Sequence, residues 1–325
     1  MVTCVIRTGA ARRSAAEAPH RRPLRRSLGT PIFFAALAIA CCAPAFFLVS
    51  AAPTVAAEPS GKPTTGRNSR EDAVRLIPLD KLTPEIRRKV SAVIADVSIY
   101  RQLPTESVDC EPDLFRFLIT NPDVLVNIWR VMGVSSVTLD RVDADQFHCS
   151  DGDGTTAQVQ VVYRSPQMQV IYADGLYDGP LFPRPVRGQC VAILQYTNSR
   201  KPSGRFEETA RLDTYLHVDN VGVELLARIF QGLVGRTIDH NFAETVAFVG
   251  NVSRTAETNP RGMHRLAAKL DHVEPERRNQ FIAVTDRVAM KLADVKLTSD
   301  DDLNPTLAEA VQPSHSETPP RTSRK

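Results

Sequence analysis

The chain has 325 residues, 42% of them hydrophobic, and carries 40 Lys and Arg against 37 Asp and Glu, a net charge of +3. Its sequence pI of about 8.5 owes most to residues 1–57, which hold 7 arginines and 1 glutamate and leave 33 basic against 36 acidic residues beyond them. That near-neutral remainder has no interleaving of aromatic and basic residues, so we expect no nucleic-acid partner.

Residues 1–57 predict export. An arginine-rich start precedes an apolar run over 32–49 and the small residues Val55-Ala56-Ala57, which suit a signal peptidase cutting before Glu58. A retained membrane anchor through 32–49 is the alternative, because about 18 apolar residues are just enough to cross a bilayer. Either way, we expect the rest of the chain outside the cytosol, periplasmic or secreted.

Three cysteines remain beyond this segment, Cys110, Cys149 and Cys190. An odd number in an exported protein leaves at least one thiol without an internal partner, and one disulfide is allowed. Each cysteine lies within or beside an apolar strand pattern, so burial as a core side chain is the simpler interpretation.

Two polar segments without periodicity, 58–70 and 298–325, are predicted to be a disordered linker and a disordered tail. Between them, 71–102 is expected to be a helical extension. The cap and first-turn residues Thr83-Pro84-Glu85 open a helix there that is predicted to end near Tyr100.

The main domain is predicted over 103–258. A short strand at 104–110 precedes two helices that begin at Pro112 and Pro122, each with an apolar side, and Gly133 is suited to end the second. Period-two alternation then predicts half-buried strands. Their marker residues are Val137, Leu139, Val159, Val161, Tyr163, Met168, Val170, Tyr172, Val191, Ile193, Leu212, Leu216 and Val218. Short polar turns at 151–154, 165–166 and 199–204 join them, which indicates an antiparallel meander.

A long helix closes the domain, from a cap at Asp219 or Asn220 to about Glu257, with a bend expected at Gly232 and Gly235. Further amphipathic helices are predicted within 259–297, around 263–271 and 275–294.

This order of elements, with Pro112-Asp113-Leu114-Phe115 and Ile128-Trp129 at matching places, resembles the START-like (SRPBCC) superfamily over 103–257. That superfamily includes polyketide cyclases, coenzyme Q-binding proteins and lipid-transfer domains. The resemblance implies an α+β helix-grip fold, in which an antiparallel meander sheet wraps the long C-terminal helix and encloses an apolar cavity.

By implication, residues between helix and sheet would bind an apolar ligand. The candidates are Trp129, Tyr163, Tyr172, Phe230 and Val234. The alternative is that these side chains fill a solid core, because a cavity and a packed core produce the same alternation.

The loop at 174–188 is the best candidate for a mobile element, since glycines and prolines frame its apolar tip, Leu181-Phe182. The tip would act as a lid or as an entrance that touches a membrane surface. Alternatively, Phe182 pins the loop onto the protein.

The last strand carries weak catalytic candidates. Asp213, Tyr215 and His217 share one face, opposite Leu212, Leu216 and Val218. A polar face turned inward would supply an acid/base set. The hydrophobic effect favours the apolar face inward, which would leave the polar row as a solvated surface.

No cofactor and no metal is expected. The acidic residues around His148 match neither zinc nor calcium spacing. Hydrolase elbows, Walker loops and dinucleotide fingerprints do not occur in the sequence.

Three functions follow from these patterns. The first is an exported, non-catalytic module that binds an apolar small molecule or lipid. The second is a cyclase- or hydrolase-type enzyme that uses the last strand, and the third is an envelope interaction protein with a filled core and a partner that the sequence does not identify.

Overall fold

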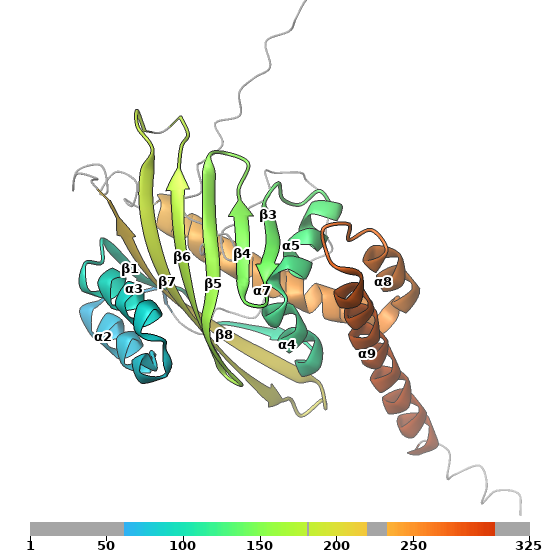
Figure 1. The fold of residues 1–325 in the computed structure, drawn as a ribbon. Helices are drawn as coiled ribbons and strands as arrows, with labels where there is room; N and C mark the ends of the chain where they lie inside the picture. Colours follow the sequence, from blue (N-terminus) through green and yellow to red (C-terminus); the bar gives the residue numbers. More distant parts are fainter. Residues whose placement is uncertain (1–61, 181, 220–232, 303–325) are drawn as a thin grey trace, which may run out of the picture. The chain divides into compact units, whose positions relative to one another are not determined.

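An eight-stranded antiparallel sheet with helices against both faces forms the centre of the fold (Figure 1). The computed structural model describes residues 62–180, 182–219 and 233–302, all within one unit of the chain, Pro31–Lys325. The predicted class, α+β with a meander sheet around a C-terminal helix, is confirmed.

The sheet follows chain order except at one edge. Its strands are β1 (Ile99–Gln102), β2 (Glu106–Asp109), β3 (Thr138–Asp143), β4 (Gln146–Ser150), β5 (Thr155–Ser165), β6 (Met168–Tyr177), β7 (Val186–Arg200) and β8 (Phe206–Val218). Strands β3 to β8 form the predicted meander, while β1 and β2 both pair with β8. The first and last strands of the domain therefore lie side by side.

Two proline-initiated helices, α4 (Pro112–Thr120) and α5 (Pro122–Val131), connect β2 to β3. Proline suits the first helical turn, where its missing N–H would have no intrahelical partner. Gly133 follows α5 with a φ of 68°, a left-handed conformation that glycine adopts without steric cost. Both helices were predicted at these places.

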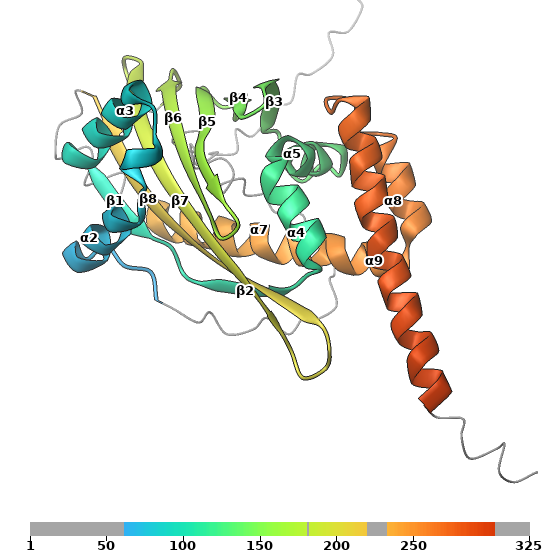
Figure 2. The same cartoon turned by 60° about the horizontal axis from the view of Figure 1, so that its bottom comes forward.

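Helix α7 (Leu233–Thr258) runs along one face of the sheet, which we call the inner face, together with α4 and α5 (Figure 2). The helix comes close to β2 at Gly250, where an added Cβ would lie 2.1 Å from Cγ2 of Val108. Of the predicted features before it, the cap at Asn220 and the bend position Gly232 lie outside the described residues. Helices α8 (Pro260–Ala267) and α9 (Pro275–Asp302) pack on α7 and, through α9, on α4.

The opposite, outer face is covered by α2 (Arg67–Leu76), a 3-10 turn (Leu79–Lys81) and α3 (Pro84–Ala95). The expectation of a linker without structure over 58–70 is wrong from Arg67 onward. The Arg70 guanidinium donates to the carbonyl of Ile94 at 3.1 Å, and the Arg70 carbonyl accepts from the hydroxyl of Tyr215 at 2.6 Å. Tertiary contacts thus order a segment whose own composition is polar.

Helix α3 ends before the predicted position. Ile99–Gln102, expected to include the end of this helix, forms β1 and pairs with β8, Tyr100 lying opposite Tyr215. The free edge of β8 offers backbone partners that local helical periodicity cannot reveal.

The loop predicted at 174–188 is shorter than expected. Strands β6 and β7 stay paired as far as Tyr177 and Val186, so only 178–185 connects them. Among the described helices, none has both the length and the apolar composition needed to span a membrane.

The three cysteines within the described chain are buried, and no disulfide joins any two of them. Burial raises the pKa of the Cys110 and Cys190 thiols to about 12. Both therefore remain neutral core side chains at physiological pH.

Candidate functional site

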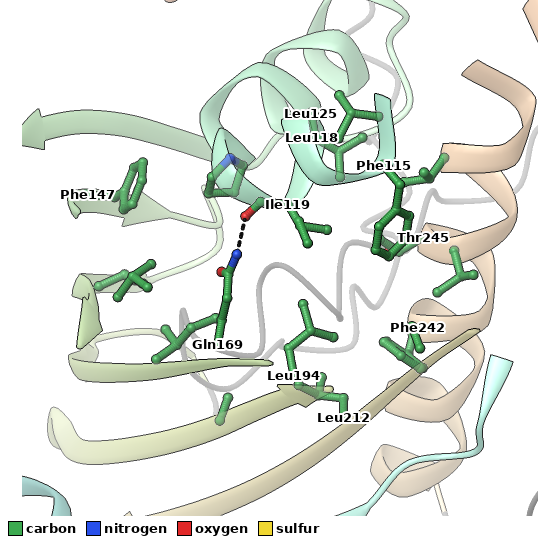
Figure 3. Close-up of a pocket in the computed structure, with 18 residues that line it drawn as sticks. Phe115, Leu118, Ile119, Leu125, Phe147, Gln169, Leu194, Leu212, Phe242 and Thr245 are labelled. Atoms are coloured by element: carbon green, nitrogen blue, oxygen red, sulfur yellow. Dashed lines mark hydrogen bonds between the residues drawn. The ribbon is translucent and has the colours of Figure 1, made fainter. Parts of the chain in front are cut away.

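A cavity of about 70 Å³ lies on the inner face of the sheet, between the strands, α4 and α7 (Figure 3). This volume is several times the roughly 10–15 Å³ that one water molecule needs on the same measure. The lining residues are Phe115, Leu118, Ile119, Pro122, Leu125, Phe147, Val159, Val161, Gln169, Ile171, Ala192, Leu194, Ala210, Leu212, Phe242, Thr245, Val246 and Val249.

Small side chains on the central strands leave the space that forms the cavity. Ala192 of β7 and Ala210 of β8 are buried beneath the helices. Opposite them stand larger side chains such as Phe115 of α4 and Phe242 of α7. Because Phe242, Val246 and Val249 recur at helical spacing, α7 presents one continuous apolar stripe to this space.

Two polar side chains reach the lining, and both are engaged. Gln169 is 1% exposed, and its Nε2 donates to the carbonyl of Ile119 at 3.3 Å, linking β6 to the end of α4 (Figure 3). The Thr245 hydroxyl donates to the carbonyl of Asn241 at 2.8 Å within α7. The cavity therefore offers a ligand mainly carbon surface.

Tyr163 and Tyr172, predicted to line the cavity, lie on the outer face instead. Both belong to the cluster beneath α2 and α3, where Lys81 Nζ stands 5.7 Å from the Tyr163 ring centroid and Lys89 Nζ 6.0 Å from that of Tyr172.

The two errors have different physical causes. In β5, a register shift between Val161 and Tyr163 reverses the facing of the residues that follow, so Val161 points inward and Tyr163 outward. In β6 both faces are apolar because helices cover both, and the inward row contains Ile171 and Ala173 rather than Tyr172.

Of the other predicted ligand-binding residues, Trp129 and Phe182 pack in the inner cluster away from the cavity lining. Trp129 contacts Phe248 edge-on at 6.0 Å between ring centroids, and Phe182 meets Tyr177 at 5.7 Å. Phe182 is thus half-buried on the protein, as the pinned-loop alternative predicts. Val234 lies in the first turn of α7, whereas Leu181 and Phe230 lie outside the described residues.

The candidate catalytic row of β8 also faces outward. Leu212, Leu216 and Val218 join the inner cluster and Tyr215 the outer one, so the apolar face looks inward as the hydrophobic effect favours. The row is not a solvated surface, however, because Asp213 and Tyr215 are each 0% exposed beneath the N-terminal elements.

Asp213 is the centre of a hydrogen-bonded network. Its carboxylate accepts from the hydroxyl of Tyr100 at 2.8 Å and from the side-chain amides of Gln102 and Gln195 at 2.9 and 3.3 Å. Arg211 pairs with it at 3.4 Å. Burial, and then the bond to Asp213, raise the pKa of Tyr100 well above its usual range.

His217 lies further along the strand and contacts the Asp96 carbonyl at 2.5 Å and the Asp219 carboxylate at 3.0 Å. Asp213 and Tyr215 hold α2 and β1 to the sheet, and none of this row lines the apolar cavity.

Sequence reasoning missed most of the cavity lining. An apolar side was predicted for the helix that begins at Pro112, but no cavity role was predicted for its residues Phe115 and Leu118. The available signal was the pair of alanines in central strands, Ala192 and Ala210, which put the smallest apolar side chains where large ones would fill the core.

No protein-family model and no curated protein matches this chain. Among solved structures, a conserved protein from Geobacillus kaustophilus is similar over 46% of this chain and 93% of its own, with 10% identity and a TM-score of 0.32. The Mll3558 protein from Rhizobium loti is similar over 45% of this chain and 97% of its own, with 16% identity and a TM-score of 0.28. Both likenesses are distant and assign the chain to no family.

Proposed function

We propose that this protein is an exported, non-catalytic binding module of the START-like type that holds a lipid-like or other apolar ligand in the cavity between the sheet and α7. The observation that carries the proposal is the cavity itself, about 70 Å³ lined by carbon-rich side chains. Export rests on the sequence of residues 1–57 alone.

The chemistry of the lining selects the class of ligand. A cavity lined by aliphatic and aromatic side chains stays dry and takes up apolar molecules, because water inside it would lose hydrogen bonds. The two polar side chains at the wall already donate to backbone carbonyls. A charged or strongly polar ligand would therefore be desolvated there without compensation.

The free-energy cost of a cavity also favours an apolar ligand. Cavity formation costs roughly 24 cal/mol per Å³, which for this volume is on the order of 2 kcal/mol. A ligand that fills the space recovers part of that free energy by making the missing dispersion contacts. At its present size, the cavity suits a small apolar group or a segment of an acyl chain.

The enzyme alternative has less support. Asp213 and Tyr215 face α2 and α3 and are fully buried, and the hydrogen bonds of Asp213 run to side chains of the sheet. An acid/base set needs access to a substrate, and these two residues have contacts that hold the fold together.

Xenon, an apolar atom smaller than benzene, is a direct probe of the proposal. We expect xenon to raise the free energy of unfolding of the full chain, by about 1.4 kcal/mol at ten times its dissociation constant. Ala192→Leu, which places a larger side chain in the cavity, should abolish this effect. Stabilisation of neither protein, or of both equally, would contradict binding in this cavity.

A further inference from the structure

A second hollow of about 100 Å³ lies beside the apolar cavity and differs from it in chemistry. Its wall includes Glu208 of β8, Tyr196 and Asn198 of β7, and Phe115 and Arg116 of α4. We call it the polar hollow.

Glu208 is the unusual group in this hollow. The residue is 2% exposed, yet within the described ranges its carboxylate makes no hydrogen bond and no ion pair shorter than 4 Å. A buried carboxylate without a partner is costly. Burial raises its pKa to about 7, and the Arg116 guanidinium partly opposes that rise. Apart from this interaction with Arg116, no contact within the described ranges engages the carboxyl of Glu208.

The polar hollow continues the apolar cavity along the same face of the sheet. On β8, Glu208 stands in one row with Ala210 and Leu212; on β7, Tyr196 stands in one row with Leu194. Ala210, Leu212 and Leu194 line the cavity, whereas Glu208 and Tyr196 line the hollow.

Phe115 is common to the walls of the two spaces. It lines both of them, and its ring packs against that of Tyr196 with 5.8 Å between centroids. The two spaces therefore meet at the side chain of Phe115.

We infer that the two spaces form one amphipathic site, in which the apolar part of the ligand fills the cavity and an N–H or O–H donor on its head group binds the carboxyl of Glu208. This inference rests on the proposed function. A carboxylate only accepts hydrogen bonds, so an amine or alcohol head satisfies it, while a carboxylate head is repelled.

The test compares three probes with the same short saturated chain, butylamine, 1-butanol and butanoate, by calorimetric titration of the full chain at about pH 8, above the raised pKa of Glu208. We expect butylamine to bind at least tenfold more tightly than butanoate, since a charge-assisted hydrogen bond is among the stronger contacts. In Glu208→Gln this preference should disappear, with butylamine weakened and butanoate strengthened.

Glu207→Gln is the matched control, because it removes the same charge one residue along the strand, where Glu207 pairs with Lys201 at 2.9 Å. It should leave the preference unchanged.

The outcomes separate the two claims. Binding of all three probes with equal affinity in wild type and Glu208→Gln would overturn this inference and leave the proposed function standing. A butanoate preference that depends on Arg116 would also overturn it. Failure of every probe to bind wild type, or undiminished binding to Ala192→Leu, would overturn the proposed function and this inference with it.

Discussion

Two alanines on the inner face of the sheet differ in the space beside their side chains. Ala192 lines the cavity, whereas Ala173 is equally buried in the inner cluster without lining it. We expect Ala192→Leu to raise the free energy of unfolding by about 0.5–2 kcal/mol through cavity filling. Ala173→Leu should lower it by about 1–3 kcal/mol through overpacking. Urea unfolding followed by the fluorescence of Trp129, the single tryptophan, measures both, and equal signs would argue against the cavity.

Glu208 should make stability depend on pH. The charged group that faces Glu208 is Arg116. The charge of Glu208 in turn raises the pKa of Cys110 and of Tyr196. Its folded pKa of about 7 lies above the ordinary value of 4.5. The folded protein therefore holds the proton more tightly, and stability falls as pH rises from about 4.5 to 7.

Glu208→Gln removes this loss. We expect the variant to be more stable than wild type by up to about 3 kcal/mol near pH 8 and to differ little near pH 4. Urea unfolding at both pH values, with Glu207→Gln alongside, measures the effect. A difference between the variant and wild type that is the same at both pH values would show that the carboxyl is not perturbed by burial.

At the level of single residues, the sequence predicted which side chains are buried better than it predicted the face of the sheet on which they lie. The alternation correctly placed Leu212 and Leu216 inward, but Tyr163 follows a β-bulge that reverses its side. Tyr172 lies in a strand with two apolar faces, for which period-two alternation carries no direction. No sequence pattern marked Glu208 as a site residue, because the lack of hydrogen-bond partners for its carboxyl arises only in the folded structure.

Helices α2 and α3 cover the face that the catalytic hypothesis needs open. The hydroxyl of Tyr215 donates to the Arg70 carbonyl of α2 at 2.6 Å. Tyr215→Phe should therefore cost about 0.5–1.5 kcal/mol and speed amide exchange in α2. Ligand binding should stay unchanged, because Tyr215 lies on the face opposite the cavity. Hydrogen exchange and xenon titration check the two parts, and a loss of binding would contradict this placement.

The elements themselves were largely predictable where local signals are strong. Prolines at 112 and 122 and the glycine after the second helix marked α4 and α5 correctly. The helix before β1 was extended too far, and the start of α2 was missed. Both depend on pairing or packing with β8, more than 100 residues away in the sequence, as the 113-residue separation of Tyr100 and Asp213 illustrates.

At the scale of the whole molecule, element order was sufficient to predict a meander sheet wrapped on a long helix. It was not sufficient to predict the cavity, because a cavity is the small difference between the space that the backbone encloses and the side-chain volume that fills it. That difference rests on residues such as Ala192, Ala210 and Phe115 meeting at one place.

Mass spectrometry of the molecules carried by the full chain, purified in mild detergent from its own host and extracted with organic solvent, tests the central claim most directly. We predict an apolar or amphipathic compound that copurifies with the wild-type protein and is depleted in Ala192→Leu. An extract without any such compound, or one with the same content in both proteins, would contradict the account.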